Sequence, residues 1–85
     1  MKFQGAVINE QNVTFAIVVV KKTVLENKTT ANKAINSFQH IFPGLPIILM
    51  AQNTKGIPTY YGRDDISKFL SKTPLQNIPW KEYTT

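Results

Sequence analysis

The sequence contains no cysteine, one histidine and one arginine among its 85 residues. Without cysteine, the chain has no disulfide framework, no thiolate ligand for zinc or an iron–sulfur cluster, and no thiol nucleophile. Glycine-rich phosphate-binding loops of the GxGxxG or GxxxxGKS/T type do not occur either. We therefore predict no catalytic residue, no metal ligand and no cofactor, and an enzyme would need a site assembled from distant segments.

Long hydrophobic segments are also missing. The longest apolar run, residues 13–20, includes Thr14 and ends at Lys21 and Lys22. It is about eight residues long, whereas a membrane-spanning helix needs roughly twenty. The N-terminal residues alternate in polarity and lack the apolar core of a signal peptide. The sequence therefore predicts one small domain, residues 1–85, that is cytoplasmic and has no membrane partner.

The charge of the chain is basic, with ten lysine and arginine residues against five acidic ones and a formal net charge of +5. A basic domain of this size is compatible with binding nucleic acid or an acidic protein. All the cations except Arg63 are lysines spread along the chain, whereas base readout and bidentate phosphate contacts favour arginine. The pattern favours a solvated lysine surface, and weak electrostatic binding of nucleic acid is the alternative.

Two strands are predicted at the start of the chain. Residues 2–9 alternate between the two faces of a strand, and residues 13–20 are rich in β-branched side chains. The polar stretch of residues 9–12 between them is too short for a crossover connection. The two strands should therefore form an antiparallel hairpin.

An apolar stripe of helical period follows, and Pro43 and Gly44 should end that helix. The stripe consists of Ala31, Ala34, Ile35, Phe38, Ile41 and Phe42. Asn27, Thr29 or Thr30 should provide the N-cap oxygen. The helix joins the strand of residues 13–20 to the next one, which should run parallel to it after a crossover.

The second half of the chain predicts two more strands and a short helix. Residues 46–52 form a buried strand, and residues 57–61 return as a strand that Pro58 places at a sheet edge. After Gly62, a helix should begin at Asp64 or Asp65, whose negative charge suits the positive end of the helix dipole.

Residues 46–70, read as strand, turn, strand, Gly62 and short helix, resemble the C-terminal ββα half of the thioredoxin fold. The resemblance covers about 25 residues and concerns topology. Thioredoxin-like oxidoreductases use a redox-active cysteine pair, and this chain has no cysteine. The resemblance therefore implies nothing about redox activity, and we assign no family from it.

The predicted fold class is α/β, with the order ββαββα, a mixed four-stranded sheet, two helices and a docked C-terminal tail. The two central strands are apolar on both faces, because residues 15, 17 and 19 and the residues between them are all apolar. Each face of the sheet must therefore be covered. Either the helices lie on opposite faces, or both lie on one face and the other meets the tail or a second subunit.

Two groups of titratable residues have simple structural explanations. His40 lies late in the first helix, where a histidine interacts favourably with the helix dipole, and no nucleophile or carboxylate is near it in the sequence. Asp64 and Asp65 are adjacent at a helix start, where they cap the helix and do not face each other across a substrate. Neither group predicts catalysis.

The strongest candidate for a binding surface combines cations with aromatic residues. It consists of Lys55, Tyr60, Tyr61, Arg63, Lys68 and Trp80, with Lys81 and Tyr83 as neighbours. Such residues suit a hot spot for a protein or a stacking surface for single-stranded nucleic acid. Strand alternation puts Tyr60 and Tyr61 on opposite faces, so only one can join a given patch. In the structural alternative, one tyrosine belongs to the core and Trp80 fastens the tail.

The leading prediction is a small non-catalytic module that binds a protein, either a second copy of itself or another chain. Its basis is the pair of central strands that are apolar on both faces, in a chain with few elements to cover them. One alternative is a weak electrostatic nucleic-acid binder. The other is a small-ligand binder or an enzyme with a dispersed site.

Overall fold

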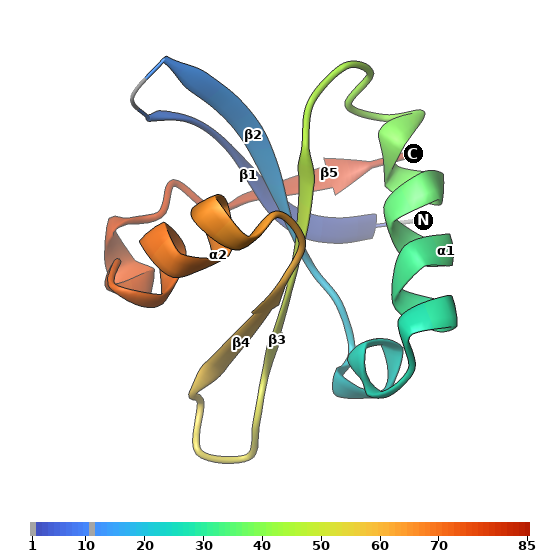
Figure 1. Ribbon diagram of the computed structural model, residues 1–85, viewed down its shortest axis with the longest axis vertical. Helices are drawn as coiled ribbons and strands as arrows, with labels where there is room; N and C mark the ends of the chain where they lie inside the picture. The colour runs from blue at the N-terminus through green and yellow to red at the C-terminus, as the bar shows by residue number, and fades with distance from the viewer. Residues whose placement is uncertain (1, 11) are drawn as a thin grey trace.

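The computed structural model describes residues 2–10 and 12–85 and has the α+β architecture shown in Figure 1. The strands are β1 (Lys2–Glu10), β2 (Val13–Val19), β3 (Ile47–Gln52), β4 (Pro58–Tyr61) and β5 (Lys81–Thr84). The helices are α1 (Lys28–Gln39), α2 (Asp64–Ser71) and the 3-10 helices η1 (Lys22–Glu26) and η2 (Leu75–Asn77). The predicted combination of a mixed sheet with two α-helices is confirmed.

The sheet has the strand order β4-β3-β2-β1-β5. β2 and β3 run parallel, and the other neighbouring pairs are antiparallel, as the predicted hairpin and crossover require. Gln11, in the predicted turn, lies outside the described residues. Asn12 next to it has a φ of 65°, a left-handed conformation that asparagine tolerates in hairpin turns.

The prediction of four strands is wrong, because the docked tail contributes a fifth strand. β5 pairs with β1, from Lys2 opposite Thr84 to Gly5 opposite Lys81. The sequence does not reveal this strand, since Lys81 and Glu82 interrupt the apolar alternation by which strands are recognised. The strand forms because the outer side of β1 offers backbone N–H and C=O groups that need hydrogen-bond partners.

Helix α1 begins at one of the predicted caps. The Asn27 side-chain Oδ1 accepts a hydrogen bond from the backbone N–H of Thr29 at 2.7 Å. The helix ends at Gln39, so Ile41 and Phe42 of the apolar stripe lie in the following turn and not in the helix. Phe42 is nonetheless buried, because this turn also packs against the sheet.

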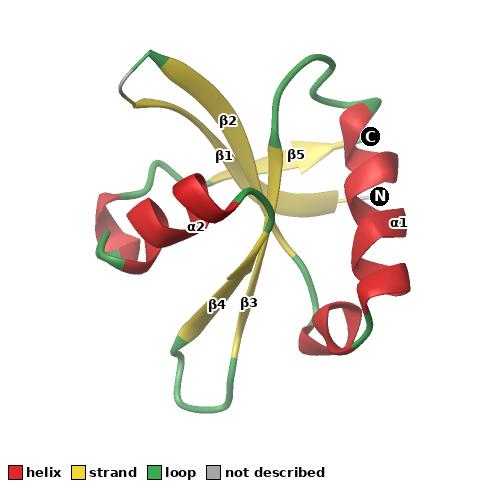
Figure 2. Cartoon of the chain, in the orientation of Figure 1, coloured by secondary structure: helices red, strands yellow, loops and turns green. Residues whose placement is uncertain are grey.

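Both faces of the sheet are covered, one by α1 and the other by α2 together with the tail (Figure 2). The buried residues of the α1 face are Phe3, Ala16, Val18, Ala31, Phe38, Phe42, Ile47 and Leu49. Those of the α2 face are Ala6, Phe15, Ile17, Ile48, Met50, Ile66, Leu70 and Ile78. Of the two arrangements open to the sequence, the structure has the helices on opposite faces.

β3, β4 and α2 form the strand, turn, strand and short helix on which the resemblance to the thioredoxin fold rests. β4 is an edge strand, as Pro58 predicts, since proline lacks the N–H that a strand with two neighbours needs. The first turn of α2 contains Asp64 and Asp65, as predicted. The prediction that they cap the helix is wrong, because the N-cap position is Arg63 and the helix start has no side-chain capping hydrogen bond within the described chain. Among the described residues, no helix is long and apolar enough to cross a membrane.

Candidate functional site

The structure separates the residues of the predicted binding surface. Tyr60 packs with the α2-face cluster and Tyr61 with the α1-face cluster, as alternation along β4 requires. Lys55 is exposed in the turn between β3 and β4, and Lys68 is exposed on α2. Trp80 packs on the α2 face. The predicted residues therefore do not form one patch.

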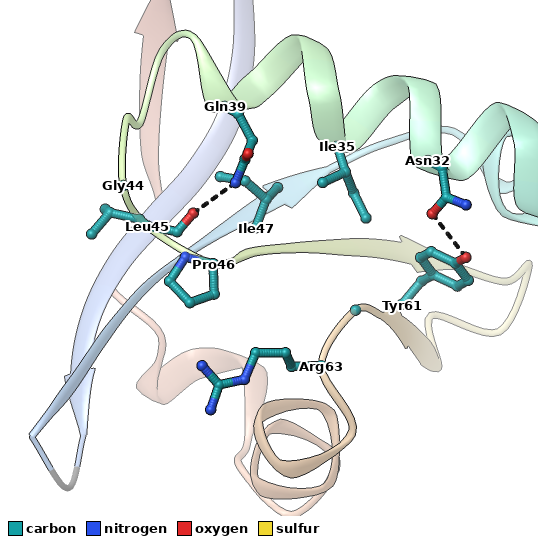
Figure 3. Close-up of a pocket in the computed structure, with 10 residues that line it drawn as sticks. Asn32, Ile35, Gln39, Gly44, Leu45, Pro46, Ile47, Tyr61 and Arg63 are labelled. Carbon is teal, nitrogen blue, oxygen red and sulfur yellow. Dashed lines mark hydrogen bonds between the residues drawn. The ribbon is translucent and has the colours of Figure 1, made fainter.

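Tyr61 and Arg63 both line a cleft of about 500 Å³ on the α1 side of the sheet, where Tyr61 points toward Asn32 and the Arg63 guanidinium extends away from Tyr61 (Figure 3). One stripe of α1, formed by Asn32, Ile35 and Gln39, makes the first wall. The junction between β4 and α2 makes the opposite wall, and the chain at the start of β3 lies between the two walls. The cleft thus joins α1 and the following start of β3 to the β4–α2 junction, which is distant from both in the sequence.

Two hydrogen bonds hold the helix wall in place. The Tyr61 hydroxyl donates to Asn32 Oδ1 at 3.1 Å and ties β4 to α1. Gln39 Nε2 donates to the Leu45 carbonyl oxygen at 3.1 Å and ties the end of α1 to the loop before β3. Within the described residues, Asn32 Nδ2 and Gln39 Oε1 make no further hydrogen bond. This wall therefore offers a free donor and a free acceptor.

Gly62 determines where Arg63 emerges. A Cβ atom on Gly62 would lie 2.5 Å from Ile48 Cδ1 and 3.0 Å from the Ile47 carbonyl oxygen. A side chain does not fit at these distances, so glycine lets the chain turn from β4 into α2 directly against β3. This close turn sets Arg63 at the mouth of the cleft.

Arg63 is held in a fixed orientation by Asp65. Its Nε donates to Asp65 Oδ1 at 3.2 Å and its Nη2 donates to Oδ2 at 2.7 Å. The hydrogen bond from Arg63 holds the pKa of the Asp65 carboxyl below its usual range, and the same bond raises the pKa of Arg63. Both side chains are more than half exposed, and an exposed ion pair of this kind contributes little to stability.

The chemistry of the cleft suits binding more than catalysis. Arg63 is the one charged side chain among the described residues that line it, and the others are amide, phenol or apolar groups. No nucleophile with a neighbouring base is present in this lining. His40 is exposed at the C-cap of α1 and does not line the cleft. Among the described residues, no group of three metal-ligating side chains gathers anywhere.

The aromatic residues on the other face have a structural role. Trp80 Nε1 donates to the Leu75 carbonyl oxygen at 3.1 Å, a hydrogen bond within the tail, and the indole packs against the α2-face cluster. The Tyr60 hydroxyl is buried without a hydrogen-bond partner among the described residues, and so is Ser67 Oγ. Burial raises the pKa of the Tyr60 phenol. Tyr60 and Trp80 therefore pack within the domain, which is the structural alternative to a role in a binding surface.

Asn32 and Gln39 line the cleft but were not predicted as site residues. The sequence shows them as polar residues on a helix, which is also typical of any solvated face. They are seven residues apart with Ile35 between them, so all three residues lie on one stripe of the helix. This mixture of amides with an apolar residue on one stripe is the signal that the sequence contains. Nothing local indicates that the β4–α2 junction lies opposite this stripe.

Comparisons with protein-family models, with curated proteins and with solved structures gave no match. The function is therefore inferred from the cleft itself. The residues that line the cleft, and the charge that Arg63 brings to it, support that inference.

Proposed function

We propose that the chain is a small non-catalytic module of the cytoplasm that binds another protein through the cleft between α1 and the β4–α2 junction. The observation that carries the proposal is that Tyr61 and Arg63 line the same partly apolar cleft. Tyrosine and arginine are enriched among the residues that dominate binding energy at protein interfaces. Ile35 and Pro46 supply apolar surface beside them.

The shape of the helix wall favours an extended segment of the partner. Asn32 and Gln39 are seven residues apart, which corresponds to about 10 Å along an α-helix. An extended chain covers this length with about three residues. The free donor of Asn32 and the free acceptor of Gln39 match the backbone C=O and N–H groups that such a segment carries. Ile35 between them suits an apolar side chain of the segment.

The other functional alternatives receive less support from the geometry. A nucleic-acid surface needs several cations side by side, whereas Lys55 and Lys68 lie away from the cleft that holds Arg63. An enzyme needs an activated acid, base or nucleophile. The polar groups of the described lining are two amides, a guanidinium and the Tyr61 phenol, which donates to Asn32 and has no base beside it. Binding of a protein segment uses all of these groups.

We favour another protein over a second copy as the partner. The prediction of self-association rests on central strands that are apolar on both faces, in a chain with few elements to cover them. In the structure, α1 covers one face and α2 with the tail covers the other, and Val18 is fully buried. Obligate dimers bury large apolar surfaces, and here these surfaces are already buried within the chain. Light scattering at high micromolar concentration should report a monomer.

Selection from a random peptide display library tests the proposal. We expect selected peptides to bind the full chain in extended form, and to perturb the backbone amide NMR signals of residues 32–39 and 61–63. Replacing Gln39 by alanine should weaken binding about two- to fivefold, because one hydrogen bond is lost.

Asn36→Ala is the matched control, since it removes an exposed amide from the same helix outside the cleft. It should leave peptide affinity unchanged. The proposal is wrong if no peptide is selected, or if the perturbed signals lie on the α2 face. Steep salt-dependent binding of oligonucleotides at the same residues would favour the nucleic-acid alternative instead.

A further inference from the structure

Arg63 already holds a carboxylate, which is that of its own neighbour Asp65. The two hydrogen bonds, at 3.2 Å and 2.7 Å, place both carboxylate oxygens against the planar fork of the guanidinium. Both side chains remain largely exposed, at 54% for Arg63 and 61% for Asp65. The Nη1 group of Arg63 makes no hydrogen bond within the described residues. The pair therefore lies open to exchange with another carboxylate.

We infer that the partner segment is acidic, and that one of its carboxylates replaces Asp65 on Arg63 at the mouth of the cleft. The inference rests on the proposed function, since it names the chemistry of the segment that the cleft binds. Asp65 is then a built-in competitor that occupies the guanidinium while the cleft is empty. Its presence lowers the affinity for the partner and keeps Arg63 oriented for binding.

The guanidinium of Arg63 supports an acidic segment. Arg63 is the one charged group in the described lining, and the lysines that give the chain its net charge of +5 do not line the cleft. Asp64 and Asp65 follow Arg63 directly, so the support comes from the guanidinium and not from the overall charge. An arginine fork binds a carboxylate in two parallel hydrogen bonds, a geometry that lysine does not provide. A neutral or basic side chain at this place could not replace Asp65, and Arg63 would stay paired with its neighbour.

The position of Asp65 explains why it can be displaced at small cost. Asp65 lies in the first turn of α2, where the free backbone N–H groups of the helix favour a negative charge. Backbone hydrogen bonds at Asp65 and Ile66 contribute, after the bond from Arg63, to lowering the pKa of this carboxyl. When a ligand takes Arg63, the helix start still stabilises the Asp65 charge.

Two end-blocked peptides test the inference, Ala-Leu-Glu-Leu and its twin Ala-Leu-Gln-Leu, by NMR titration of the full chain. The glutamate peptide should bind about two- to threefold more tightly, because the new ion pair is exposed and replaces the one that Arg63 already makes with Asp65. Arg63→Ala should abolish this difference. Asp65→Asn should increase the affinity for the glutamate peptide about threefold, as expected when an exposed competing ion pair is removed.

Asp64→Asn is the matched control. It changes the net charge by the same amount at the same helix start, but Arg63 donates its hydrogen bonds to Asp65. It should change the affinity much less than Asp65→Asn does. An equal gain in both variants would show that net charge alone acts, and would overturn the role of Asp65 as a competitor.

Propionate serves as a second probe. Together with the two peptides, it distinguishes failure of the inference from failure of the proposed function. If both peptides bind equally well in the cleft, the acidic specificity is wrong and the proposed function stands. If propionate shifts the Arg63 side-chain signals in the Asp65→Asn variant but no peptide binds more tightly than propionate, the carboxylate site stands. In that case the binding of a protein segment is wrong.

Discussion

The two faces of the sheet are closed by different kinds of packing. On the α1 face, Phe3 stacks on Tyr83 with ring centroids 5.2 Å apart, and Phe38 and Phe42 meet Phe3 edge-on at 5.0 and 6.3 Å. The rings come from β1, from β5, from α1 and from the turn after α1. The α2 face is instead covered by α2 and the tail, whose buried side chains Ile66, Leu70 and Ile78 are aliphatic, while Phe69 and Trp80 pack there partly buried.

The adjacent tyrosines of β4 show that, within the described residues, the hydroxyl finds a hydrogen-bond partner on one face of the sheet and none on the other. Tyr61 reaches the margin of the α1 face, where its hydroxyl donates to Asn32 and helps form the cleft. Tyr60 points into the α2 face, where its hydroxyl is buried without a partner among the described residues. The same residue type therefore contributes to a binding wall on one face and carries a desolvation penalty on the other.

The largest expected effect tests whether a helix of eight residues is enough to close the α2 face. Leu70 is fully buried, so Leu70→Ala should lower the free energy of unfolding by about 2–5 kcal/mol, as measured by urea denaturation. Lys72→Ala, at the exposed end of the same helix, should change it by less than about 0.5 kcal/mol. A loss below about 1 kcal/mol in Leu70→Ala would show that α2 is not needed to cover this face.

Gly62→Ala should have the next largest effect, because it breaks the close turn that leads from one face to the other. We expect a loss of about 1–3 kcal/mol of stability from crowding against Ile48 and the Ile47 carbonyl. Gly56→Ala is the control, since nothing lies within 4 Å of its Cβ position and only the φ of 81° is strained. It should cost about 1 kcal/mol. Equal losses would contradict the crowding explanation.

The two tyrosines of β4 allow a matched pair of substitutions, and their effects on stability should have opposite signs. Tyr61→Phe loses the hydrogen bond to Asn32 and should destabilise the protein by about 0.5–1.5 kcal/mol. Tyr60→Phe removes a buried, unpaired hydroxyl and should be neutral or slightly stabilising. Thermal denaturation of both variants measures the contrast. A destabilised Tyr60→Phe would show that its hydroxyl has a partner after all.

The smallest effect concerns the pH dependence of the Arg63 and Asp65 pair. The pKa of Asp65 in the folded protein is lowered, chiefly by the hydrogen bond from Arg63. This carboxylate therefore adds stability above the unfolded pKa of about 4, and the contribution is lost as the pH falls through the folded pKa. Arg63→Ala should raise the pKa of Asp65 in an NMR titration, and an unchanged pKa would show that the two groups do not interact in solution.

Much of the fold follows from local patterns in the sequence. The β-branched run of residues 13–20 predicts a strand, the stripe of α1 predicts a helix, and Pro58 predicts an edge strand, all of which the structure contains. The fifth strand was missed, because Lys81 and Glu82 carry no strand pattern and pair only where β1 leaves an edge free. Tyr61 and Arg63 were identified as candidates, whereas Asn32 and Gln39 were not.

Local patterns alone show that the central strands are apolar on both faces, since alternation and side-chain chemistry are local properties. They also show that Tyr60 and Tyr61 diverge, because neighbouring residues of a strand point to opposite faces. Which face each helix covers, and which stripe of α1 meets the β4–α2 junction, become visible only in the packed fold. Those relations depend on how distant segments pack together, and no local pattern records that packing.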